Sequence, residues 1–193
     1  MILSLLLATA EAYAELPGAT ATWTPLAESP VAIDCTAWKG KPYCRSTGVI
    51  TAPVSQAASV FAGLDQHVAK MGAISRIQRL EADVLHVVMD YPFPLTDRDY
   101  VARFSRRQEG SAEVFSWVPV VHAGAPVSTD TIRLTWLDGE WRFAPEGTNT
   151  RVTYTWQADP GGNLPDVGAV RSKAGYLAVL DIANACGAQL VSP

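Results

Sequence analysis

A single long helical pattern, at the end of a chain that otherwise predicts strands, limits the possible folds most. Near the C-terminus the apolar residues follow one another at intervals of 3, 4, 3 and 4 residues, at Tyr176, Val179, Ala183, Cys186 and Leu190. That repeat is typical of one face of an α-helix. One helix cannot cover a sheet of about nine strands, so we expect the sheet to curl around it. The sequence therefore predicts an α+β fold with a curled antiparallel sheet around a long C-terminal helix.

The strand predictions rest on segments rich in β-branched and aromatic residues, several with alternating apolar and polar side chains. They span residues 21–26, 31–38, 41–51, 75–81, 84–91, 99–107, 113–122, 131–143 and 151–158. Such two-sided strands are typical of an antiparallel sheet with one dry and one wet face. Two short helices are predicted after the third strand, one over residues 51–63 and one over residues 65–71.

Two cysteines flank a turn signal early in the chain. With Lys39 and Gly40 as the turn of a hairpin, Cys35 faces Cys44 at a non-hydrogen-bonded position, where Cα atoms lie about 4.5 Å apart. That separation is within the range of a disulfide. We therefore predict a Cys35–Cys44 disulfide and a buried, unpaired Cys186.

A second hairpin is predicted over residues 131–143. Asp138 and Gly139 form a strong type I′ turn signal. That turn would pair Trp136 with Trp141 and would place both on the apolar face, together with Leu134 and Phe143. The two tryptophans would line a cavity or stack across the strands for stability.

The N-terminus predicts export. An apolar run over residues 2–10 precedes Ala12-Tyr13-Ala14, a small-x-small site of the kind signal peptidase cuts. We expect residues 1–14 to be a signal peptide, residues 15–193 to be one domain, and the protein to be periplasmic or secreted. No Lys or Arg precedes the apolar run, so the alternative is an N-terminal core helix or strand in a cytoplasmic protein.

The composition excludes several classes of protein. The net charge of −4 and the isoelectric point of 5.3 argue against a nucleic-acid-binding protein. The 193 residues suit a single domain with a full core and a cavity inside it. The chain has no G-x-S-x-G, P-loop or H-E-x-x-H motif, and His67, His86 and His122 are scattered. We therefore predict no catalytic residues and no metal site.

Four stretches, in order, resemble the START domains (steroidogenic-acute-regulatory-related lipid transfer). They are TGVITAP at residues 47–53, YPFPLTDRDYV at 91–101, GEWRFAP at 139–145 with the strand over 150–156, and ADPGGNLP at 158–165. The resemblance covers roughly residues 20–190 and implies the helix-grip fold. START domains hold one lipid or other hydrophobic molecule between the sheet and the C-terminal helix, usually without catalytic residues or cofactor.

The resemblance also shows one departure. Cholesterol-carrying START domains have a buried acid–arginine pair on two neighbouring cavity strands, and the corresponding positions here are Leu85 and Phe104. Because a sheltered charge is costly without a partner, an apolar pocket is easier to build. The resemblance therefore does not extend to the cholesterol site.

The inward faces of the predicted elements supply the candidate ligand-binding residues. They are Leu85, Val87, Met89, Tyr100, Ala102, Phe104, Trp136, Trp141, Phe143, Tyr154, Trp156, Tyr176, Val179, Leu180 and Ala183. Each could instead be core without ligand contact. Tyr100, Tyr154 and Tyr176 are distinctive, because a buried hydroxyl needs a partner, and a ligand head group could be one.

Three functions remain open at this stage. The first is a monomeric carrier or sensor of a lipid or other hydrophobic small molecule, with transient contact to a membrane surface. The second is an enzyme, cyclase-like or hydrolase-like, acting in the same cavity; it needs a positioned acid–base pair, and only tyrosines are predicted to face inward. The third is an interaction module with a filled core.

Overall fold

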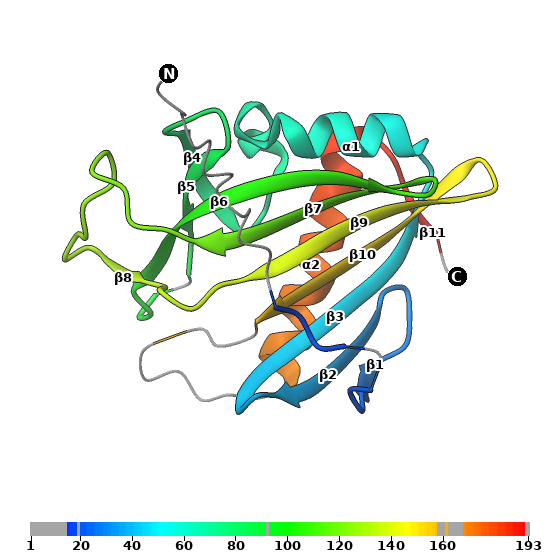
Figure 1. Ribbon diagram of the computed structural model, residues 1–193, viewed down its shortest axis with the longest axis horizontal. Helices are drawn as coiled ribbons and strands as arrows, with labels where there is room; N and C mark the ends of the chain where they lie inside the picture. Colours follow the sequence, from blue (N-terminus) through cyan, green and yellow to red (C-terminus); the bar gives the residue numbers. More distant parts are fainter. Residues whose placement is uncertain (1–14, 19, 92, 158–160, 162–167, 192–193) are drawn as a thin grey trace, which may run out of the picture.

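The computed structural model describes residues 15–18, 20–91, 93–157, 161 and 168–191 (Figure 1). The strands are β1 (Thr24–Ala27), β2 (Ala32–Trp38), β3 (Lys41–Ile50), β4 (Ile74–Arg79), β5 (Val84–Met89), β6 (Asp97–Glu109), β7 (Ala112–Pro119), β8 (Thr131–Arg133), β9 (Gly139–Glu146), β10 (Asn149–Gln157) and β11 (Leu190–Val191). The helices are α1 (Val54–Ala62) and α2 (Gly168–Cys186), with 3₁₀ turns η1 (Leu64–Gln66) and η2 (Val68–Lys70).

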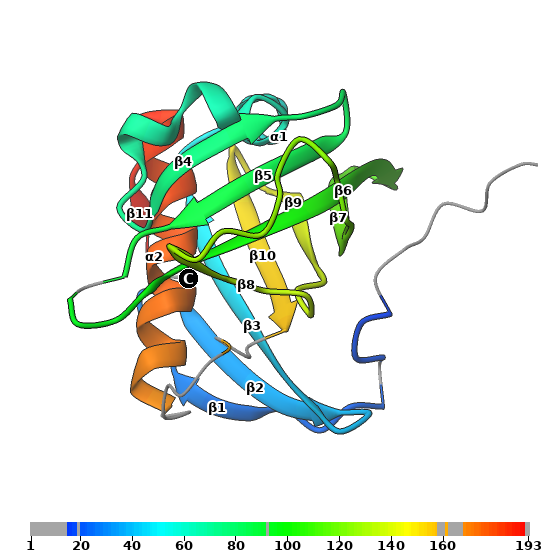
Figure 2. The same cartoon turned by 90° about the vertical axis from the view of Figure 1, so that its left-hand side faces the viewer.

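One sheet contains all these strands. Nine follow the order β1-β2-β3-β10-β9-β7-β6-β5-β4 with antiparallel neighbours, while β11 pairs with β3 and β8 pairs in parallel with β6. Figure 2 shows the sheet curling around α2, with α1 across one end. The predicted α+β fold, with nine strands along the main path, is therefore confirmed. The second predicted short helix consists of the two 3₁₀ turns.

The two helices cover different parts of the concave face. Helix α2 packs on β1, β2, β3 and β10, whereas α1 packs on β7, β9, β10 and α2. Val179 and Ala183 of α2 belong to the same core as Ala57 and Phe61 of α1, and Cys186 is buried there as an unpaired cysteine. Among the described helices, none combines the length and apolar character needed to cross a lipid bilayer.

Close approach of α2 to the sheet depends on glycine. A Cβ atom on Gly175 would lie 2.2 Å from the Ser46 hydroxyl of β3 and 2.7 Å from the Trp156 ring of β10. A Cβ on Gly48 of β3 would lie 3.1 Å from Val179. The absence of side chains at both positions lets the helix sit directly on the strands.

The cysteine hairpin has the predicted register. Lys39 and Gly40 both have positive φ, at 50° and 75°, as a type I′ turn requires. Cys35 faces Cys44 with the Cα atoms 4.1 Å apart, and the two form a disulfide. This prediction succeeded because turn and register are set by neighbouring residues.

The predicted hairpin over residues 131–143 is wrong. Residues 131–133 pair with β6, and β9 instead runs between β7 and β10. Gly139 is needed for packing: a Cβ atom there would lie 2.3 Å from the Trp117 ring and 2.4 Å from the Thr155 carbonyl oxygen. Asp138 accepts a hydrogen bond from the Tyr43 hydroxyl at 2.9 Å. Long-range pairing therefore outweighs the local turn preference.

Two predictions concern residues outside the described part of the chain. The proposed signal peptide covers residues 1–14, and most of the stretch over 158–165 is likewise not described. Export therefore stays a prediction.

Candidate ligand-binding site

A row of stacked rings forms the floor of the interior. Phe143 and Trp141 on β9 continue into Tyr154 and Trp156 on β10, with successive centroids 6.1, 4.1 and 4.6 Å apart and planes within 16° of parallel. Tyr154 and Trp141 are directly opposite each other in the β9–β10 register. This row forms a rigid aromatic surface facing the helices.

Helix α1 contributes one ring to this surface. Phe61 contacts Phe115, Trp141 and Phe143 at centroid distances of 4.8, 5.5 and 5.7 Å. It also meets Phe104 of β6 edge-on at 6.2 Å. Phe61 therefore seals the end of the interior that α1 covers.

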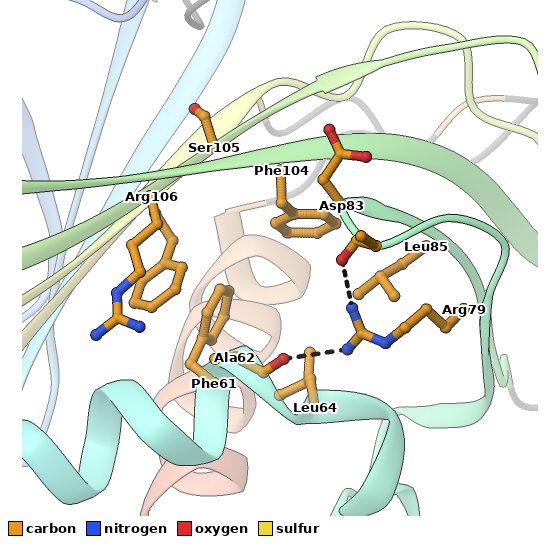
Figure 3. A pocket seen from close by; sticks show the side chains of 11 residues that line it. Phe61, Ala62, Leu64, Arg79, Asp83, Leu85, Phe104, Ser105 and Arg106 are labelled. Atoms are coloured by element: carbon orange, nitrogen blue, oxygen red, sulfur yellow. Dashed lines mark hydrogen bonds between the residues drawn. The ribbon is translucent and has the colours of Figure 1, made fainter.

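An open pocket of about 280 Å³ lies beside this seal (Figure 3). Its apolar wall comes from α1, η1, β5, β6 and β7, through Phe61, Leu64, Leu85, Phe104 and Phe115. The charged residues Arg79, Asp83 and Arg106 stand at its rim. An apolar wall with a polar rim suits a hydrophobic small molecule.

Arg79 forms hydrogen bonds that connect the elements at the rim of the pocket. Its guanidinium donates to the carbonyl oxygens of Ala62, at 3.1 Å, and Ala82, at 2.9 Å, two of the pocket's own residues. It also pairs with the Asp65 carboxylate. That pairing holds the pKa of Asp65 below its usual range, against a smaller opposing effect of burial. The arginine thus joins the end of α1 to the β4–β5 turn.

Phe104 links the pocket to a deeper region. Its ring lies 6.0 Å from Trp117 of β7, which in turn lies 5.7 Å from Tyr154. Burial raises the pKa of Tyr100 and of Tyr154 well above the ordinary phenol value, and the neighbouring Tyr100 and Tyr91 raise that of Tyr154 further. Tyr100 and Tyr154 are therefore neutral phenols that pack against the main core.

A buried arginine lies at the end of this region. Arg98 is on the same face of β6 as Tyr100, is only 2% exposed, and stacks over the Tyr91 ring at 4.4 Å. Its guanidinium donates to the carbonyl oxygens of Thr96 and Gly161. The preceding Asp97 accepts a hydrogen bond from the Tyr91 backbone N–H at 2.9 Å. These hydrogen bonds hold the turn before β6.

A buried ionic cluster lies on the opposite face of β5 and β6. The Asp99 carboxylate accepts hydrogen bonds from His86 at 2.7 Å, from Thr131 at 2.9 Å and from Arg133 at 2.7 Å. Burial opposes ionisation of Asp99, but the hydrogen bonds outweigh it and hold its pKa below the usual range. The cluster fastens β8 to β6, away from the aromatic interior.

Most of the predicted binding residues lie together. Six are in the main core, namely Ala102, Trp141, Phe143, Trp156, Val179 and Ala183, and four are partly buried against it, namely Tyr100, Phe104, Tyr154 and Tyr176. Leu85 lines the pocket, and Val87 is fully buried on β5. Met89 and Leu180 are half-buried outside that core.

Trp136 is the clear exception among the predicted residues. It is 62% exposed and lies beside Lys41, whose Nζ is 4.1 Å from the ring centroid. The reason is the absent hairpin, since residue 136 belongs to the connection between β8 and β9. The expectation that Trp136 faces the interior is therefore wrong.

The sequence prediction missed four interior residues. Phe61, Phe115 and Trp117 complete the aromatic interior, and Arg98 is buried on the same face of β6 as Tyr100. The aromatic and β-branched residues of the segment 112–119 were the available signal for Phe115 and Trp117. Within the part of the chain that the structure describes, His, Cys, Asp and Glu do not gather in a group of three or more able to hold a metal ion.

Solved structures, two of them named as lipid transfer proteins, share this architecture. The STAR-related lipid transfer protein from Xanthomonas axonopodis superposes with a TM-score of 0.73 at 16% identity, covering 85% of this chain and 98% of that chain. Human STARD10 gives 0.70 at 18% identity, covering 88% and 74%. Human StAR-related lipid transfer protein 5 gives 0.68 at 14% identity, covering 87% and 88%.

The chain has the START fold. The helix-grip architecture implied by the sequence resemblance is thereby confirmed. No protein-family model matches the sequence, and no curated protein sequence matches it. Within this START fold, Leu85 and Phe104 line the same apolar pocket.

Proposed function

We propose that the protein binds a compact hydrophobic molecule in the interior of its START fold. The observation that carries the proposal is the apolar pocket between α1, β5 and β6, whose Phe104 contacts Trp117, which in turn stacks on the half-buried Tyr154. Burial of apolar ligand surface would supply the binding free energy, at about 25 cal/mol per Å². The lipid-transfer names of the matched structures support the same function.

The size of the pocket favours a small ligand. Small-molecule sites span roughly 300–1,000 Å³, and the open pocket has about 280 Å³. One acyl chain or a small ring system suits this volume better than a two-chain phospholipid does. The proposed ligand is therefore a single-chain or compact hydrophobic molecule.

We further propose that binding proceeds without chemistry. The buried His86 and Asp99 are the most enzyme-like pair in the described residues, but they lie on the opposite face of the sheet, in contact with Arg133 and Thr131. The groups that face the interior are phenols with strongly raised pKa values, which are poor general bases at neutral pH. This arrangement supports a carrier or sensor.

A blocking substitution tests the site. Ala62 lines the pocket and is exposed at the end of α1, so Ala62→Trp places a large ring over the pocket with little strain. We expect binding of the neutral dye Nile red, followed by its fluorescence, to weaken about tenfold in this variant.

Ala37→Trp is the matched control, since Ala37 is exposed on β2, across the sheet from the pocket. This variant should bind the dye as the unmodified protein does. Equal binding by Ala62→Trp, with an unchanged melting temperature, would show that this pocket is not the route to the interior.

A further inference from the structure

Two tyrosine hydroxyls inside the START fold have no hydrogen-bond partner among the residues that the structure describes. Tyr100 on β6 and Tyr154 on β10 pack against the main core, yet across the described residues neither hydroxyl makes a hydrogen bond. Both side chains are half-buried, and each hydroxyl oxygen keeps some accessible surface. Buried hydroxyls are normally satisfied. The two hydroxyls are therefore available to a polar group of a ligand.

A third donor lies beside the pair. The indole Nε1 of Trp117 is fully buried and has no hydrogen-bond partner, and its ring is stacked 5.7 Å from that of Tyr154. Tyr100 and Tyr154 both pack against the main core, and the neighbouring Tyr100 contributes to the raised pKa of Tyr154. Three unpartnered donors from three strands thus lie in one region.

We propose that Tyr100, Tyr154 and Trp117 bind an uncharged oxygen atom of the ligand, so that the ligand is a hydrophobic alcohol or ketone. The inference rests on the proposed function and names the ligand class of the same site. Phe104, between the pocket and Trp117, would contact the apolar body of the molecule next to its oxygen.

The charges around the site argue against a carboxylate ligand. Arg98 is on the same face of β6 as Tyr100, but its guanidinium holds the carbonyl oxygens of Thr96 and Gly161 and stacks on Tyr91. A carboxylate would therefore be buried among neutral donors without a dedicated cation, which is unfavourable. An alcohol or ketone oxygen has no such cost.

Three probes of equal chain length test the ligand class by displacement of Nile red. We expect decanol to bind the unmodified protein about tenfold more tightly than decane, because only decanol can use the donors. Decanoate should bind more weakly than decanol. Equal affinity for decane and decanol, or tighter binding of decanoate, would overturn the inference while leaving hydrophobic binding intact.

Conservative variants assign the effect to the two hydroxyls. Tyr100→Phe and Tyr154→Phe should each weaken decanol binding about fivefold and leave decane binding unchanged. Tyr43→Phe is the control, since Tyr43 lies on the outer face of β3 with its hydroxyl on Asp138. Unchanged decanol affinity in both interior variants would contradict the assignment. Failure of every probe to displace the dye would instead contradict the proposed function itself.

Discussion

At the scale of single residues, a buried carboxylate on α2 joins that helix to the start of β4. Asp181 is 7% exposed and accepts hydrogen bonds from the backbone N–H groups of Gly72, at 2.9 Å, and Ala73. The helical pattern of the sequence places Asp181 off the apolar stripe. It is nevertheless buried, because the loop after η2 crosses that side of the helix. Burial raises the pKa of Asp181, and the two backbone hydrogen bonds oppose this only in part.

This raised pKa gives a pH-dependent contribution to stability. The folded protein holds the Asp181 proton more tightly than the unfolded chain does, so this group's contribution falls as pH rises from the ordinary carboxyl pKa through the raised one. Asp181→Asn removes that loss but keeps an oxygen that can accept from Gly72. We expect the variant's free energy of unfolding, relative to the unmodified protein, to increase between about pH 4 and about pH 7. Urea unfolding at both pH values measures it, and a pH-independent difference would contradict the account.

The residues of the interior show what a single sequence can reveal. Alternation correctly placed Tyr100, Ala102 and Phe104 on one face, because period-2 strands have only two faces. The partners of those residues were not predictable in this way. That Phe104 meets Phe61 and Trp117 depends on how α1 and β7 pack, which local patterns do not determine.

At the scale of elements, the β2–β3 hairpin is held by its own covalent link. Its disulfide joins residues nine apart in sequence, and Cys44 is fully buried under the core. Closing a loop of that size restricts the unfolded chain and contributes about 2.5 kcal/mol in the chain-entropy model. The hairpin also presents β3 to both α2 and β10, so its loss would affect the helix-covered side of the sheet.

We therefore expect the double variant Cys35→Ala/Cys44→Ala to lose about 2–3 kcal/mol of unfolding free energy. Urea unfolding with and without a reductant measures the loss. Reductant should destabilise the unmodified protein and the control Cys186→Ala, in which the unpaired cysteine is replaced, but not the double variant. A reductant effect of the same size on all three proteins would show that the disulfide is not responsible.

The two hairpin predictions differ in outcome for a physical reason. At Lys39–Gly40 the two flanking strands are sequence neighbours and sheet neighbours, so the turn decides the pairing. At Asp138–Gly139 the same kind of turn signal lies where β9 must enter between β7 and β10. There the glycine serves the close contact with Trp117 rather than a turn. Turn residues therefore predict hairpins only where no more distant strand competes.

At the scale of the whole molecule, the fold prediction rested on one long helix being too small to cover a flat sheet of about nine strands. A sheet path of nine strands curls so that α2 covers one half of its concave face and α1 a part of the other. The sequence therefore predicted the fold and the inner face. It did not predict the 280 Å³ pocket, whose walls are brought together from α1, η1, β5, β6 and β7 by tertiary packing.

The central claim is that this interior holds one hydrophobic molecule, and native mass spectrometry of protein purified from its own host tests it most directly. We predict a complex with about one small, uncharged hydrophobic ligand per chain, which organic extraction would release for identification. A chain whose native mass equals that of the bare polypeptide, and which also takes up neither Nile red nor decanol, would contradict the claim and favour a filled-core interaction domain.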